Sequence, residues 1–146
     1  MTVMNSPKKI HLVSNALCYG PMPAPDEDIE QHLTINSKGQ VWFSSYNFGV
    51  CGNPYQKSNS SRFSIKKEKA EILLNSIAKY FSEEHQDLFV TDIGHWTLDI
   101  TDIDDNTYRF HGSLCGTFQV DGVDLSELLR SLLGMDNLFA FNGQAE

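Results

Sequence analysis

Thiol and imidazole groups stand close together near residue 113 of this sequence. His111 and Cys115 are separated by three residues, and the Gly-Ser pair between them could bend the chain so that both side chains converge. Together with Cys18 and Cys51 they would complete a Cys₃His set, which is a common tetrahedral zinc site. No C-x₂-C pair is present. The alternative is that the cysteines are small buried apolar residues and the histidine lies on the surface.

The same segment could also hold a cysteine nucleophile. A thiol nucleophile needs an imidazole within hydrogen-bond reach and a third group that orients the imidazole. His95 or His111, together with Asp99, could serve Cys115 in this way. Residues 112–116, Gly-Ser-Leu-Cys-Gly, match neither a nucleophile elbow nor a cysteine-protease signature. We therefore expect a protein that is not an enzyme, and we keep a small cysteine hydrolase as one alternative.

Carboxylates are concentrated between residues 83 and 105. The candidate group consists of Asp99, Asp102, Asp104 and Asp105, together with Glu83, Glu84 and Asp87 at the end of the preceding helix. An Asp-x-Asp-Asp run offers oxygen ligands to a hard cation, but the glycine and the closing glutamate of an EF-hand loop are missing. Two interpretations remain. The group is either a soluble hairpin tip or a surface that meets a basic groove, since complementary charge speeds encounter and selects partners.

The net charge of −8 is distributed unevenly along the chain. Residues 83–146 contain thirteen carboxylates and two basic side chains, whereas residues 57–79 contain six Lys or Arg and two Glu. Acidic net charge disfavours duplex nucleic acid and anionic membranes as partners. Imitation of DNA is also disfavoured, because duplex DNA carries one charge per about 1.7 Å and same-face carboxylates on a strand recur only every ~6.7 Å. A basic protein surface is therefore the predicted partner.

Residues 31–48 give the clearest hairpin. Apolar and polar residues alternate on either side of a three-residue loop, residues 37–39, in which Gly39 suits the left-handed conformation. The predicted register pairs Ile35 with Val41, Leu33 with Phe43, Thr34 with Trp42, and His32 with Ser44. The second face then carries an aromatic row of Trp42, Tyr46 and Phe48. This row is either covered by another element or is a contact surface.

A second hairpin is expected over about residues 95–115. Its turn lies in Asp102–Asn106, where side chains favour turns by hydrogen bonding to the backbone. One register places Asp99 opposite Arg109, and a two-residue shift places it opposite His111, so both registers remain open.

Two helices are expected. The first is basic and amphipathic and covers about residues 66–84. Its apolar stripe consists of Leu73, Ile77, Tyr80 and Phe81. The second covers residues 125–133, begins after Asp124, whose spacing to Glu127 resembles a capping box, and ends at Gly134.

The remaining segments complete the fold prediction. Residues 10–14 could form a short strand, residues 18–28 and 49–61 have the composition of loops, and residues 135–143 could add a short strand. These elements predict a single α+β domain over residues 1–146, in which an antiparallel sheet built from two hairpins packs against one long and one short helix.

The expected location is the cytoplasm. No apolar stretch approaches the roughly 20 residues that span a bilayer, and the first twenty residues do not resemble a signal peptide. Three cysteines are an odd number and fit reduced thiols.

Three segments carry a resemblance to a known class of proteins. LTINSKGQVWFSSYNFG, WTLDITDIDDNTYRFHGSLC and DLSELLRSLLGMDNLFAFNG resemble small acidic proteins of bacterial phages and mobile elements. Some such proteins are anti-CRISPR inhibitors, which bind a Cas effector and block nucleic-acid entry or a conformational step. The resemblance covers about half of the chain and implies no site residue.

The predicted function is that of a non-enzymatic, acidic protein-binding inhibitor of the anti-CRISPR type. It would dock on a basic surface of a Cas nuclease in the bacterial cytoplasm without contacting nucleic acid or membrane. The predicted partner-binding residues are Glu83, Glu84, Asp87, Asp99, Asp102, Asp104, Asp105, Trp42, Tyr46 and Phe48. No cofactor is required in this interpretation. A zinc-stabilised module with Cys18, Cys51, His111 and Cys115 as ligands is the other alternative.

Overall fold

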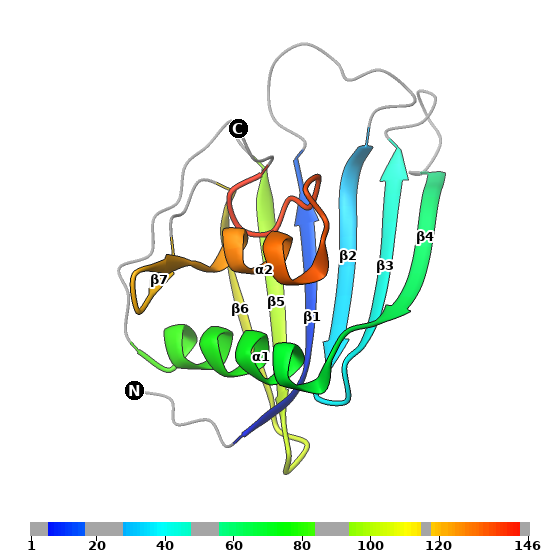
Figure 1. Cartoon of the computed structure of the whole chain (residues 1–146). Coiled ribbons are helices and arrows are strands. Elements are labelled where there is room, and N and C mark those ends of the chain that lie inside the picture. The colour runs from blue at the N-terminus through cyan, green and yellow to red at the C-terminus, as the bar shows by residue number, and fades with distance from the viewer. Residues whose placement is uncertain (1–5, 17–27, 48–55, 84–93, 115–117, 144–146) are drawn as a thin grey trace.

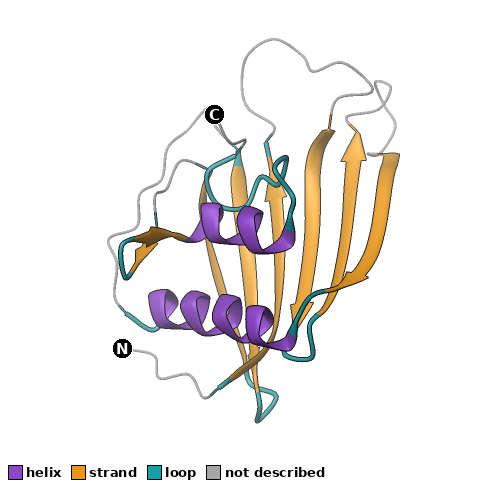
Figure 2. Ribbon diagram, viewed as in Figure 1, coloured by secondary structure: helices purple, strands orange, loops and turns teal. Residues whose placement is uncertain are grey.

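A six-stranded antiparallel sheet and two helices form two layers (Figures 1 and 2). The computed structural model of the chain describes residues 6–16, 28–47, 56–83, 94–114 and 118–143. Both helices lie against the same face of the sheet, and a short two-stranded ribbon leads into the second helix (Figure 2). The predicted α+β two-layer class is confirmed.

The strand order is β4-β3-β2-β1-β5-β6. The strands of this sheet are β1 (Pro7–Asn15), β2 (Asp28–Asn36), β3 (Gln40–Asn47), β4 (Gln56–Ser64), β5 (His95–Asp102) and β6 (Thr107–Ser113). The ribbon consists of β7 (Gln119–Val120) and β8 (Val123–Asp124). The short strand expected over residues 10–14 is thus a nine-residue strand in the interior of the sheet, where it joins the two hairpins and buries Ile10 and Leu12.

The first hairpin has the predicted register. All four predicted pairs are present between β2 and β3. Gly39 has a φ of 89°, as the loop requires, and a Cβ atom at this position would overlap the carbonyl oxygen of Ile65. Gly39 also accepts a hydrogen bond from the Ile65 amide, so the turn is fixed against the end of β4.

The second hairpin adopts one of its two predicted registers, with Asp99 opposite Arg109. The turn is built around Asp102, whose carboxylate accepts hydrogen bonds from the amides of Asp104 and Asn106 at 2.9 and 3.0 Å. Asp105 has a φ of 64°, a conformation that aspartate tolerates better than most residues.

The loop predicted over residues 49–61 is wrong in its second half, because β4 begins at Gln56. This segment is rich in Ser and Asn and lacks apolar alternation, so composition favours a loop. An edge strand needs only one partner, however, and β4 pairs along its length with β3. Phe63 lies opposite Val41 and packs against the core, which ties the polar strand to the sheet.

The core lies between the sheet and α1 (Lys67–Phe81) together with α2 (Leu125–Leu133). Helix α1 contacts β1, β2 and α2, and it buries Leu73, Ile77 and Phe81 as predicted. Helix α2 begins at the predicted cap, since the Asp124 carboxylate accepts a hydrogen bond from the Glu127 amide. It ends at Gly134 in the left-handed conformation, with a φ of 67°.

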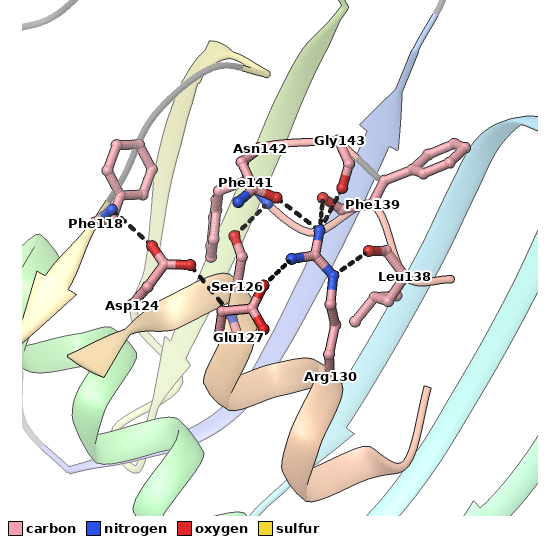
Figure 3. Close-up of polar contacts among 10 residues, drawn as sticks. All are labelled: Phe118, Asp124, Ser126, Glu127, Arg130, Leu138, Phe139, Phe141, Asn142 and Gly143. Atoms are coloured by element: carbon pink, nitrogen blue, oxygen red, sulfur yellow. Dashed lines mark hydrogen bonds and ion pairs between the residues drawn. The ribbon is translucent and has the colours of Figure 1, made fainter. Parts of the chain in front are cut away.

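The short strand predicted over residues 135–143 is wrong. This tail forms turns that cover the sheet face beside α2, and it buries Leu138, Phe139, Ala140 and Phe141. Arg130 holds it in place (Figure 3). Its guanidinium, on a side chain only 3% exposed, donates to the carbonyls of Leu138, Phe139 and Gly143, to Asn142 Oδ1 and to Glu127 Oε1.

Candidate binding face

The sheet face that points away from the helices, here called the outer face, is the candidate site. Neither helix of the described structure covers it, because both helices lie on the opposite side (Figures 1 and 2). One row of side chains crosses it in register, with one residue from each strand. From β4 to β6 the row consists of Arg62, Trp42, Thr34, His11, Asp99 and Arg109.

Three contacts fix the side chains of this row. Arg109 donates two hydrogen bonds to Asp99, at 2.7 and 3.1 Å. The Arg109 hydrogen bond lowers the pKa of Asp99 against the opposing effect of burial. His11 Nδ1 lies 2.8 Å from Thr34 Oγ1. The row is therefore a set of mutually oriented polar groups.

All histidines in the described part of the chain lie on the outer face. They are His11, His32, His95 and His111. The rings of His11 and His32 meet edge to face at 5.9 Å, and His32 also packs on Tyr46 at 4.8 Å. His32 Nε2 lies 2.9 Å from Glu30. Burial, followed by the neighbouring His32, lowers the pKa of His11.

The outer face carries two aromatic–cation pairs between β3 and β4. Trp42 lies opposite Arg62, whose guanidinium carbon is 5.7 Å from the ring centroid, and Tyr46 lies opposite Lys57. A register shift between Ser45 and Tyr46 brings Lys57 into line with Tyr46, whereas simple alternation from Arg62 would place it on the inner face. Both cations are exposed, and neither forms an ion pair with a described residue.

The hairpin tip, residues 102–105, is not the exposed acidic surface that the sequence predicts. Asp102 is 0% exposed, so its inclusion among the partner-binding residues is corrected: its carboxylate is engaged by the turn amides and by the Tyr108 hydroxyl. Asp105 is exposed and forms an ion pair with Lys8. Asp104 is exposed as well. The tip is thus partly neutralised rather than a patch of free carboxylates.

Other carboxylates of the acidic half also meet cations. Asp121 is paired with Lys79 at 3.0 Å, and Glu127 with Arg130 at 2.8 Å. These pairs and the Lys8–Asp105 pair bring cations next to carboxylates of the acidic half.

The remaining predicted site residues divide into two groups. Trp42, Tyr46 and Asp99 share the outer face, and Glu83 is exposed just after α1. Glu84, Asp87, Phe48, Cys18, Cys51 and Cys115 lie outside the described residues. The zinc and nucleophile predictions therefore stay predictions. Within the described ranges, no three His, Cys, Asp or Glu side chains are grouped to hold a metal ion.

Sequence reasoning missed His11, Thr34 and Arg62 as members of one row. The signal for His11 and Thr34 was present in the alternation of β1 and β2, but the row appears only when the order of the strands is known. Arg62 was missed because most of its strand, residues 56–61, has the composition of a loop. These three residues connect the aromatic row of the first hairpin to the Asp99–Arg109 pair of the second.

No protein-family model matches this chain, and a search of curated proteins finds no match either. The fold and the outer face together define a two-layer α+β protein with one helix-covered and one polar sheet face. No helix among the described residues has the length and apolar character needed to cross a membrane.

Proposed function

We propose that this protein is a non-enzymatic binding protein whose outer sheet face docks on another protein. One observation carries the proposal: a six-stranded face that no described helix covers presents Trp42, Tyr46, Arg62 and Arg109. Trp, Tyr and Arg are the residue types that contribute most to binding energy at protein interfaces. If this face contacted only water, placing two half-buried aromatic rings beside cations on it would add no binding energy.

The size of the outer face suits this role. Six strands spaced about 4.8 Å apart, each about 26 Å long over eight residues, cover roughly 750 Å² in projection. A protein–protein interface of standard size uses about 800 Å² on each partner. The face also supplies a mixture of aromatic, cationic and hydrogen-bonding groups, which matches the composition of such interfaces.

The narrower form of the proposal is inhibition of a Cas nuclease, and it rests on the resemblance described above. The ion pair Lys8–Asp105 at the hairpin tip, and the pairs Lys79–Asp121 and Arg130–Glu127 elsewhere in the acidic half, argue against docking by the acidic half alone. We therefore assign the contact to the outer face, which includes Asp99, rather than to the hairpin tip, residues 102–105. Cleavage of DNA by candidate Cas effectors in the presence of excess protein tests this narrower form, and unimpaired cleavage by all of them would remove it.

Comparative capture from bacterial lysate tests the broader proposal. The double variant Trp42→Ala/Arg62→Glu alters the outer face. The matched control, Lys69→Glu/Ile72→Ala, makes the same kinds of change at exposed positions of α1. We expect the wild type and the control to retain one common partner and the outer-face variant to lose it. Thermal unfolding shows that each variant is folded. Equal capture of that partner by all three proteins would refute the proposal.

A further inference from the structure

Strand β4 forms one end of the sheet. It pairs with β3, and no second strand of the described structure pairs with its other side. An edge strand presents a row of backbone N–H and C=O groups that can pair with an added strand. Such strand addition is a recurrent mode of peptide recognition, in which backbone hydrogen bonds supply affinity and alternate side chains supply specificity.

The side chains of β4 on the outer face give this edge a definite character. Arg62 and Lys57 are exposed and cationic, and Ser60 between them is small. Neither cation is ion-paired within the described residues, whereas Arg109, on the edge strand at the other end of the sheet, is already bound to Asp99. An added strand on β4 would place alternate side chains about 5 Å from those of Arg62 and its same-face neighbours.

We infer that an acidic, extended segment of the partner protein adds to the edge of β4 that no described strand occupies, with carboxylates beside Arg62 and Lys57. The inference rests on the proposed function and names the chemistry of the partner. Residues 59–64 supply the regular part of the edge, since the register shift near Tyr46 interrupts the ladder before Lys57. The carboxylate beside Lys57 lies beyond that shift. Trp42 and Tyr46 lie opposite the two cations on β3, one strand further from the added segment.

Charge selects this occupant over a second copy of the chain. Pairing of two β4 edges would bring Lys57 and Arg62 of both copies together, and like charges opposite one another destabilise a strand pair. Lysine and charge on an edge strand are a common device against self-pairing. The same cations attract a strand that carries carboxylates.

Charge also selects an acidic peptide over single-stranded nucleic acid. A nucleic acid has no peptide groups to pair with the β4 edge, and its affinity depends on many Lys and Arg contacts with phosphate. Glu30 and Asp99 lie on the same face as the two cations, and the whole chain carries −8. A short acidic segment can contact Arg62 and Lys57 while fewer of its charges come near the carboxylates of the chain than those of a longer nucleic acid would.

Fluorescence anisotropy with a short labelled peptide that alternates Glu and Val tests the inference. We expect salt-sensitive binding that weakens at least tenfold, or about 1.4 kcal/mol, in the Lys57→Glu/Arg62→Glu variant. The control variant Lys69→Glu/Lys79→Glu makes the same change in charge on α1 and should bind as the wild type does. Circular dichroism checks that both variants are folded. Hydrogen exchange should show slower exchange of β4 amides when the peptide is bound.

Three further probes separate the outcomes. A peptide with Gln in place of Glu should bind at least about tenfold more weakly, and a Glu–Val peptide methylated on alternate backbone nitrogens should not bind if strand pairing is required. Equal binding of the methylated peptide would overturn strand addition. Binding of a thymidine oligonucleotide but not of the acidic peptide would overturn the choice of partner, and so would self-association of the wild type through β4.

The failure of this inference can be told apart from failure of the proposed function. If the acidic peptide does not bind, yet Trp42→Ala/Arg62→Glu still abolishes capture of the cellular partner, the inference is wrong and the outer face remains the docking surface. If the acidic peptide does not bind and Trp42→Ala/Arg62→Glu leaves capture of the cellular partner unchanged, both the inference and the proposed function are wrong.

Discussion

The carboxylate of Asp102 lies inside the turn between β5 and β6, where it accepts hydrogen bonds from two amides, from the Asn106 side chain and from the Tyr108 hydroxyl. Asp99, three residues earlier, is oriented by Arg109 on the outer face. Asp124 caps a helix. An aspartate side chain in this protein therefore organises a turn, belongs to an ion pair on the outer face or caps a helix, and the hydrogen-bond donors around it decide which.

Replacing Asp102 by Asn should change how stability depends on pH. Burial raises the pKa of Asp102, but the hydrogen bonds from Asn106, Asp104 and Tyr108 lower it by more, so its net pKa is below the ordinary value. The ionised group therefore stabilises the fold above its unfolded pKa of about 3.9, and this contribution is lost as the pH falls through the folded pKa. Urea unfolding should show a wild-type advantage that is constant at neutral pH and shrinks below about pH 4.

Asp104→Asn is the matched control, since Asp104 is exposed in the same turn. Its unfolding midpoint should stay closer to that of the wild type at neutral pH. Equal losses in the two variants would contradict the structural role given to Asp102.

Gly39→Ala should destabilise the protein for two reasons that a matched variant can separate. A φ of 89° costs a non-glycine residue about 1–3 kcal/mol, and the added Cβ would also overlap the Ile65 carbonyl oxygen. Gly122 has a φ of 82°, and a Cβ added there would have no atom within 4 Å, so Gly122→Ala carries the first cost alone. Chemical denaturation should show the larger loss for Gly39→Ala, and equal losses would show that the contact with Ile65 has no energetic effect.

Among the elements, those with a local signal were predicted well. Gly39 indicates the turn of the first hairpin, and Asp124 and Gly134 indicate the two ends of α2. The conformations of these residues depend on neighbours in sequence. The strand β4 lacks such a signal, because its place is set by pairing with β3 and by the burial of Phe63. The candidate site extends over all six strands, so it could be predicted only as far as the first hairpin, where Trp42 and Tyr46 were identified.

The tail after α2 was also beyond prediction, for a different reason. Its buried Leu138, Phe139 and Phe141 suggest a strand, but its backbone groups are satisfied by side chains rather than by a neighbouring strand. Arg130 supplies several of these donors, and Gln31 donates to the Asn137 carbonyl and accepts from the Phe139 amide. Partners this distant in sequence leave no periodic pattern.

Replacing Arg130 by Met should therefore release the tail. A buried carbonyl left without a donor costs about 1–3 kcal/mol. Arg130 donates to the carbonyls of Leu138, Phe139 and Gly143, and only that of Phe139 keeps a second donor, the Gly143 amide. We therefore expect a loss of at least about 1 kcal/mol, for the buried Leu138 carbonyl alone. Urea unfolding measures the loss, and hydrogen exchange should show faster exchange in residues 138–143. Arg62→Met, at an exposed position, is the control and should change the midpoint little. Unchanged exchange in the tail would contradict the anchoring role.

At the scale of the whole molecule, the fold brings together charges that the sequence keeps apart. Lys8 and Lys79 come from the first half of the chain and its middle, and they meet Asp105 and Asp121 from the acidic second half. The carboxylates on the outer face, Glu30 and Asp99, are likewise engaged by His32 and Arg109. Among the described residues, Arg62 and Lys57 are thus exposed cations of the outer face without an ion pair, although the chain as a whole is acidic.

The position of His11 in the middle of this face leads to a prediction about the stability of the whole protein. Burial lowers the pKa of His11, His32 lowers it further, Asp99 raises it, and Lys9 and Arg109 lower it, so the net effect is a lowered pKa. Unfolded His11 has a pKa of about 6.5 and so binds a proton more readily than folded His11 does. Stability linked to this residue is therefore complete above about pH 6.5 and decreases as the pH falls.

The variant His11→Gln keeps a polar side chain beside Thr34 but cannot titrate. Between pH 7.5 and 5.5, its free energy of unfolding should therefore fall less steeply than that of the wild type, by no more than about 1.4 kcal/mol per pH unit, which is the limit for one proton. Urea unfolding across this range measures the slopes. Ser44→Ala, a non-titrating change on the same face, should leave the wild-type slope intact. A His11→Gln slope parallel to that of the wild type would show that protonation of this half-buried ring does not oppose folding.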